Sequence, residues 1–159
     1  AGGQAEPARR LKVKQEFDAI QRRDFADQAF AVIRDYFRGS CAEINDVEDV
    51  KARFEEMGDA AFTCMVVNRG MMRGRGEGHI TVRNDKGRHH FGDISYVYES
   101  HAGPGTSNGA ARVEAGVYNL YLTLDEFMGR GEHKYDAQQV AERMWVDFVR
   151  QAGIEIDDD

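Results

Sequence analysis

The chain has 159 residues, of which 42% are hydrophobic and 31% are charged, and its formal net charge is -7 at pH 7. This length suits one domain with its own core, and this composition excludes a disordered chain. The negative charge excludes a protein that coats nucleic acid with its whole surface, but not one with a local basic patch. No apolar run is long enough to span a membrane and no secretory segment is present, so we expect no membrane partner.

The first ten residues are polar and predict a disordered lead-in, residues 1–10. Because the chain begins without methionine, we expect a processed end, a cloning remnant or the cut edge of a larger parent protein. A single domain is predicted over residues 11–153, followed by an acidic tail over residues 154–159.

A long amphipathic helix is predicted from Lys14 to Phe37, because apolar residues recur there every three or four positions. Gly39 is expected to end it. The aromatic content of its apolar face predicts packing under a sheet or, alternatively, a dimer or interdomain face. A second helix is predicted after a cap at Asn45 or Asp46. Gly58 is expected to end this helix. Its apolar residues are spaced by three and four: Val47, Val50, Phe54 and Met57.

Strands and glycine-rich turns fill the middle of the chain. Ala61–Val67 is apolar on both faces and predicts an inner strand. A hairpin follows, with a four-residue turn at 84–87, and its register would place His79 opposite Asp93. The residues on one face of that hairpin are expected to be buried in the core: Ile80, Val82, Ile94, Tyr96 and Tyr98. The residues on the other face are expected to be exposed: His79, Arg83, His89, Asp93 and Ser95.

After the hairpin, residues 101–110 are small and predict a loop with little to order it. Strands are predicted at 112–115 and at 117–124, where Tyr118 shares a face with the leucines that alternate after it. The last helix is expected to start at Asp136, with Gln139 completing a capping box. Its buried stripe ends at a glycine stop, Gly153, and consists of Val140, Ala141, Met144, Trp145, Phe148, Val149 and Ala152.

These elements predict an α+β fold. It has two N-terminal helices, a mainly antiparallel sheet of four or five strands, and a C-terminal amphipathic helix, with the helices on one side of the sheet. A cone-like sheet curved around a helix is the alternative architecture, and it would create a ligand cavity.

The placement of charge gives the strongest functional indication. From Arg69 to His90 there are six arginines and lysines against two acidic residues, in a chain that is negative overall. We therefore predict a binding surface formed by the glycine-rich loop and the exposed sheet face. Its candidate residues are Arg69, Arg73, Arg75, His79, Arg83, Lys86, Arg88, His89, Phe91 and Asp93.

The function that these residues indicate is a non-catalytic binding or regulatory module that captures a protein partner or self-associates as a homodimer. One alternative is a nucleic-acid-binding domain, in which arginines follow the phosphates and Phe91 or Tyr121 stacks on a base. Another is a small hydrolase in which Asp93 orients His79 near Ser95. The two cysteines, Cys41 and Cys64, are expected to be buried reduced thiols, so a cytoplasmic setting is expected.

The sequence does not indicate a cofactor or a metal. The glycine-rich stretch at 101–110 lacks the lysine that a phosphate-binding loop needs. His89 and His90 are adjacent in a predicted strand and would point to opposite faces. His79, Asp93 and His101 could form a zinc site only if the loop folded back onto the sheet.

Overall fold

The computed structural model describes residues 16–71, 76–86, 92–105, 107–126, 129–130 and 133–156. Two helices flank a run of strands along the chain. The elements are α1 (Ala19–Ile44), β1 (Val50–Glu56), β2 (Ala61–Asn68), β3 (Glu77–Asn84), β4 (Ile94–Val97), β5 (Gly109–Ala115), β6 (Leu120–Glu126), β7 (Gly129–Arg130) and α2 (Ala137–Arg150).

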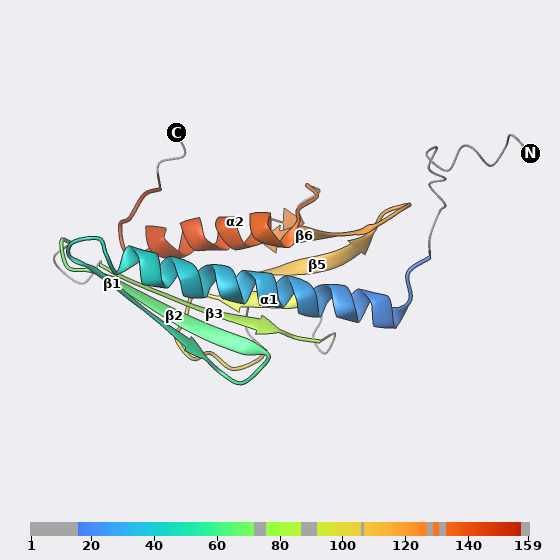
Figure 1. Ribbon diagram of the computed structural model, residues 1–159, viewed down its shortest axis with the longest axis horizontal. Coiled ribbons are helices and arrows are strands. Elements are labelled where there is room, and N and C mark those ends of the chain that lie inside the picture. The colour runs from blue at the N-terminus through green and yellow to red at the C-terminus, as the bar shows by residue number, and fades with distance from the viewer. Residues whose placement is uncertain are drawn as a thin grey trace, which may run out of the picture.

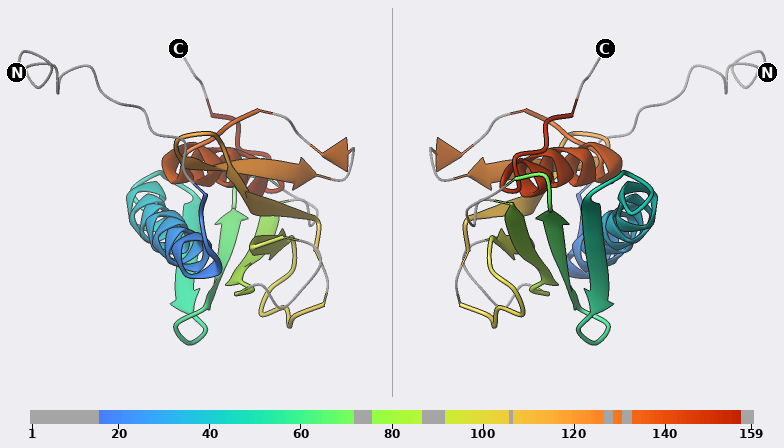
Figure 2. Two further views of the ribbon diagram at one scale, coloured as in Figure 1. Left: turned by 90° about the vertical axis from the view of Figure 1, so that its right-hand side faces the viewer. Right: turned by 90° about the vertical axis from the view of Figure 1, so that its left-hand side faces the viewer.

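The strands form one antiparallel sheet in which each pairs with its neighbours in the sequence, in the order β1-β2-β3-β4-β5-β6-β7. Both helices lie on one face, which we call the inner face, and run side by side (Figure 1). Figure 2 shows the sheet curving around them. The predicted α+β class, antiparallel sheet and C-terminal helix are confirmed. The prediction of four or five strands is wrong, since the described residues form a seven-stranded sheet.

Helix α1 starts at a capping box, in which the Asp18 side chain accepts from the Gln21 N–H and the Gln21 side chain accepts from the Asp18 N–H. The predicted stop at Gly39 is wrong, because the helix continues to Ile44. Glycine costs a helix interior only about 1 kcal/mol, and the turn that follows it packs Cys41 into the core.

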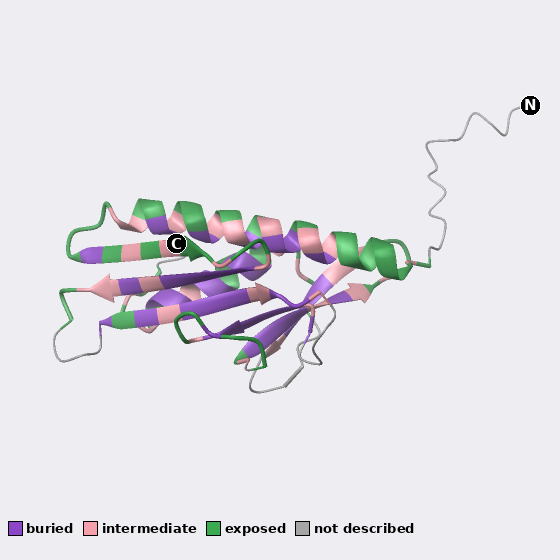
Figure 3. Cartoon of the chain, turned by 90° about the horizontal axis from the view of Figure 1, so that it is seen from below, coloured by how far each residue is buried: buried purple, intermediate pink, exposed green. Residues whose placement is uncertain are grey.

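The predicted second helix is also wrong, because its residues form a turn and then strand β1. The spacing of Val50 and Phe54 suits a helix, but Ala52 lies between them and faces the same way. Lys51 and Arg53 are exposed on the opposite face, which is the period of two of a strand. Figure 3 shows this alternation along the strand next to α1.

Helix α2 follows the sequence prediction closely. Asp136 caps it, Gln139 completes the capping box, and Gly153 has a positive φ of 77° just after its end. The predicted stripe is buried throughout. Trp145 is only 6% exposed, and its ring centroid lies 5.4 Å from that of Phe37 on α1. The prediction that Trp145 belongs to the buried stripe is confirmed.

The predicted register of the hairpin is wrong. Thr81 pairs with Val97, not with Phe91, so the connection between β3 and β4 is longer than a four-residue turn. The shift is an even number of residues, so each side chain keeps its face. Ile80, Val82, Ile94 and Tyr96 are therefore buried as predicted, and Tyr98 packs against them.

The opposite, outer face is not open along its whole length. The Thr81 hydroxyl lies 2.7 Å from the Glu99 carbonyl and accepts the Ala102 N–H at 3.1 Å, while the Thr63 hydroxyl accepts the His101 N–H. We call residues 98–105 the strap, because they cross the centre of this face. The prediction of a loop at 101–110 with little to order it is wrong for residues 101–105. Ser95, predicted to be exposed, is 4% exposed.

Farther along, β6 begins at Leu120, so Tyr118 lies before the strand and is 49% exposed rather than aligned with its inner face. The alternation of the following leucines is confirmed, because Leu122 and Leu124 are buried in the core.

Candidate functional site

The most cationic part of the described outer face lies where β1 and β2 pair. Lys51 pairs with Val67 and Arg53 with Met65, so two cations stand beside two half-buried apolar side chains. Arg69 follows β2 directly. These five residues line a shallow hollow of about 360 Å³ together with Asn45 and Ala52. We call the surface formed by Lys51, Arg53, Met65, Val67 and Arg69 the cationic ledge.

Two acidic residues near the ledge, Glu55 and Glu77, each contact a histidine. Glu55 Oε2 lies 3.2 Å from His101 Nε2 on the strap, and Glu77 Oε1 lies 3.1 Å from His79 Nε2. Within the described part of the chain, no carboxylate forms an ion pair with Lys51, Arg53 or Arg69. The ledge therefore presents positive charge to solvent beside an apolar floor, in a protein whose total charge is negative.

The structure brings together only some of the predicted site residues. Arg69 lies on the ledge, and His79 lies next to it because it pairs with Met65. Arg83 and Asp85 line a separate hollow of about 220 Å³ at the far end of β3. Five other residues of the predicted site lie outside the described residues: Arg73, Arg75, Arg88, His89 and Phe91.

Two further residues of the predicted site, Asp93 and Lys86, have structural contacts near the ends of the β3–β4 connection. Asp93 Oδ2 accepts the backbone N–H of Val113 at 2.8 Å, which ties the end of the β3–β4 connection to β5. Lys86 has a positive φ of 53° in the turn after β3, where its N–H donates to Asn84 Oδ1. Neither residue adjoins the ledge hollow.

The predicted pairing of His79 with Asp93 is wrong. Pairing of β3 with β4 begins at Thr81, so His79 lies beyond the end of that ladder. Its backbone N–H and C=O instead bond the side-chain amide of Gln151, each at 3.2 Å. With Ser95 buried opposite Arg83, the geometry that the hydrolase alternative required is not formed.

The zinc set that would have needed the loop to fold back, His79, Asp93 and His101, does not assemble either. Among the residues that the structure describes, no group of three or more His, Cys, Asp or Glu side chains could hold a metal ion. His101 points to Glu55 and to the Ser100 hydroxyl, 2.9 Å from its Nδ1. Its backbone has a positive φ of 51°, which the hydrogen bonds of the strap hold in place.

The sequence analysis missed Lys51 and Arg53 as site residues. Their signal was present, because both alternate with Val50, Ala52 and Phe54. Reading that segment as a helix would have scattered these cations around an axis, whereas the strand places them on one face.

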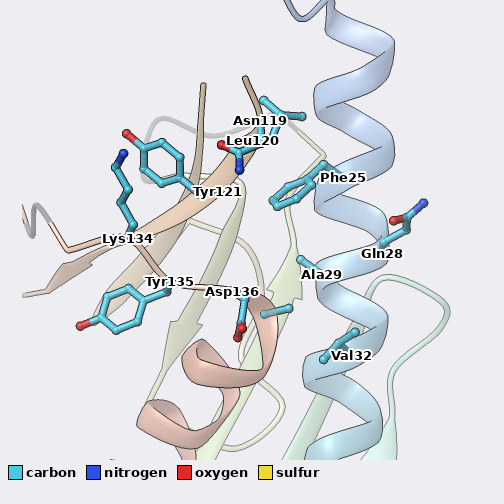
Figure 4. Close-up of a pocket in the computed structure, with 11 residues that line it drawn as sticks. Phe25, Gln28, Ala29, Val32, Asn119, Leu120, Tyr121, Lys134, Tyr135 and Asp136 are labelled. Carbon is cyan, nitrogen blue, oxygen red and sulfur yellow. The ribbon is translucent and has the colours of Figure 1, made fainter. Parts of the chain in front are cut away.

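A further hollow lies on the inner side, between the first half of α1 and the start of α2. It has a volume of about 490 Å³. Figure 4 shows Phe25 and Val32 on α1 facing Leu120 and Asp136 across it. We call this hollow the helix cleft. Its walls are mainly apolar, and it is lined by Phe25, Gln28, Ala29, Val32, Asn119, Leu120, Tyr121, Lys134, Tyr135, Asp136 and Ala137.

The two cysteines lie together under the sheet. Cys41 Sγ of α1 is 3.8 Å from Cys64 Sγ of β2, and both thiols are free and buried. The hydrogen bond that the protonated Cys64 thiol shares with Cys41, together with burial, raises the pKa of the Cys64 thiol well above its ordinary value. The Cys64 thiol is therefore neutral, and both thiols are free and buried in the core, as the sequence predicted.

Comparison with known proteins places the described sheet within a family. The model of the Y4lF protein domain matches residues 51–150, which run from β1 to the end of α2. The chain is 54% identical over 105 residues to "Uncharacterized protein y4kM" of Sinorhizobium fredii (strain NBRC 101917 / NGR234), an overlap of 65% of this chain and 89% of that protein. No solved structure shows a significant match. Neither described helix is long and apolar enough to cross a membrane.

Proposed function

We propose that this chain, which belongs to the Y4lF protein domain family, is a non-catalytic binding module that captures an acidic segment of a partner protein on its cationic ledge. The observation that carries the proposal is the set of three cations, Lys51, Arg53 and Arg69, without carboxylate partners in the described residues. A cytoplasmic setting is part of the proposal, because it rests on reduced thiols at Cys41 and Cys64.

The floor of the ledge favours a protein over nucleic acid. Met65 and Val67 are half-buried between the cations, so a bound segment would bury apolar side chains as well as neutralise charge. Base stacking needs an open aromatic face. Tyr121, one of the two aromatics suggested for that role, has Lys134 Nζ 4.8 Å from its ring centroid.

The edge of the sheet is not the surface that we propose for binding. The Asn45 side chain hydrogen-bonds both the N–H and the C=O of Ala52 on the free side of β1. The Arg38 guanidinium lies 5.1 Å from the ring centroid of Phe54. Because these side chains cover β1, an added strand would have to displace them. The face of β1 and β2, rather than their edge, is therefore the proposed contact.

A fluorescence anisotropy titration with a labelled oligoglutamate peptide tests the proposal. Arg53→Glu should weaken binding by about tenfold or more, because it reverses charge at the centre of the ledge. Arg23→Glu is the matched control. It makes the same change in net charge on the first turns of α1, and should alter binding by less than about twofold.

Equal losses in the two variants would show that only net charge matters, and would refute the ledge. A titration with a labelled oligothymidylate distinguishes protein binding from the nucleic-acid alternative. If it binds more tightly than the peptide and loses affinity steeply from about 50 to about 200 mM salt, the nucleic-acid function replaces the one proposed.

A further inference from the structure

One stripe of α1 makes the contact with α2. Tyr36 and Phe37 lie on this stripe, and the ring centroid of Trp145 is 6.5 Å from the first and 5.4 Å from the second. Phe148 extends the contact, with its centroid 6.0 Å from that of Phe37. The C-terminal half of α1 is therefore covered by a helix that runs beside it (Figure 1).

The same stripe continues toward the N-terminus of α1 without a helix beside it. Phe25, Ala29 and Val32 precede Tyr36 at the spacing of four, three and four that keeps residues on one helical face. Helix α2 begins at Ala137, so only its first residue lies at the cleft beside them. They line the helix cleft instead, where Val32 is 40% exposed.

The cleft therefore continues the groove that α2 occupies. Its opposite wall is formed by Leu120 of β6 and by the residues that lead into α2. Polar groups also line the cleft. One of them, the Asp136 carboxylate, already accepts the Gln139 N–H at 2.8 Å and so has a partner within the chain. An apolar groove beside a helix suits an amphipathic helix whose apolar residues recur at three and four.

We infer that the helix cleft binds an amphipathic helix of a partner protein, seated on α1 in line with α2. This inference goes beyond the proposed function, because the cleft lies on the inner side of the sheet and shares no residue with the cationic ledge. Either surface can fail its test without affecting the other.

A labelled peptide with the sequence of α2, Ala137–Arg150, is the direct probe, because it already matches the stripe of α1. Added to the full chain, it should raise fluorescence anisotropy with a dissociation constant in the range of about 10 to 100 µM, as expected of a short helix in a groove. A peptide of the same composition, with its apolar residues scattered around the helix, should bind at least about tenfold more weakly.

Val32→Glu tests the location. A carboxylate on the apolar wall should weaken binding of the α2 peptide by about tenfold or more. Ile20→Glu is the matched control, since Ile20 is 72% exposed on α1 and does not line the cleft. Far-ultraviolet circular dichroism should show both variants folded.

Three results would overturn the inference. The first is no binding up to about 1 mM peptide. The second is binding that Val32→Glu leaves unchanged, which would mean that the peptide displaces α2 rather than entering the cleft. The third is a dimer in sedimentation velocity that Val32→Glu converts to monomer, which would assign the cleft to a second copy of the chain.

Discussion

Asn45 bonds both backbone groups of Ala52 on the free edge of the sheet. Its Oδ1 accepts the Ala52 N–H at 2.8 Å, and its Nδ2 donates to the Ala52 carbonyl at 3.1 Å. Gln151 does the same for His79 on β3, beyond the point where β4 begins to pair. In each case an amide side chain from a helix end replaces the missing neighbouring strand.

Replacing Asn45 should therefore loosen the β1 edge. Asn45→Ala leaves the Ala52 N–H and C=O without their partner, which should lower the free energy of unfolding by about 1 to 2 kcal/mol in urea denaturation. Asp46→Ala, one residue further in the exposed turn, is the control and should have little effect. No difference between the two variants would show that water satisfies the Ala52 backbone equally well.

The strap should depend on the Thr81 hydroxyl. Thr81→Val keeps the shape of the side chain but removes the group that binds Glu99 and Ala102. We expect about 1 to 3 kcal/mol of lost stability and faster hydrogen exchange at the Ala102 amide. Ser107→Ala should not accelerate that amide. Unchanged exchange in Thr81→Val would show that other contacts hold the strap on the outer face.

The cysteine pair should be inert while the protein is folded. Burial keeps both thiols from a soluble disulfide reagent such as Ellman's reagent, and the raised pKa of Cys64 keeps its thiol neutral. Both should react at once on unfolding in urea. Rapid reaction of the native chain would mean that α1 separates from β2 under native conditions.

The raised pKa of Cys64 also predicts a dependence of stability on pH. The folded thiol stays protonated where the unfolded thiol ionises, so its contribution is complete below the unfolded pKa and falls as pH rises above it. Above about pH 8.5, stability should decline by up to about 1.4 kcal/mol per pH unit from this group. Cys64→Ala should reduce that slope in urea denaturation at pH 7 to 10, and an identical slope would contradict the assignment.

The apolar floor of the ledge makes its own prediction. Met65→Ser removes apolar surface without changing charge, so it should weaken an acidic peptide that carries leucines by about threefold to tenfold. It should leave an oligoglutamate peptide nearly unaffected. Equal effects on the two peptides would mean that Met65 acts on the shape of the ledge rather than by apolar contact.

The sequence predicted best those elements in which local signals agree. Asp136, Gln139 and Gly153 fix both ends of α2, and its stripe has one period throughout. The core face of the hairpin was also predictable. The register was not, because a turn signal at 84–87 says nothing of how far the chain runs before β4 begins.

The site was harder to predict because it depends on pairing across the sheet. Val50 and Phe54 suit both a helix and a strand, and only the contacts of β1 with α1 and β2 select the strand. The ledge then unites residues from β1 with Arg69 after β2. The helix cleft depends on where α2 begins relative to α1, which no local pattern in the sequence specifies.

The most direct measurement is a nuclear magnetic resonance titration of the isotopically labelled chain with the oligoglutamate peptide. The proposed function predicts amide shifts at Lys51, Arg53, Met65, Val67 and Arg69 that saturate together and are lost in Arg53→Glu. Saturating shifts confined to other surfaces, or no shifts at all, would contradict the cationic ledge as the binding site.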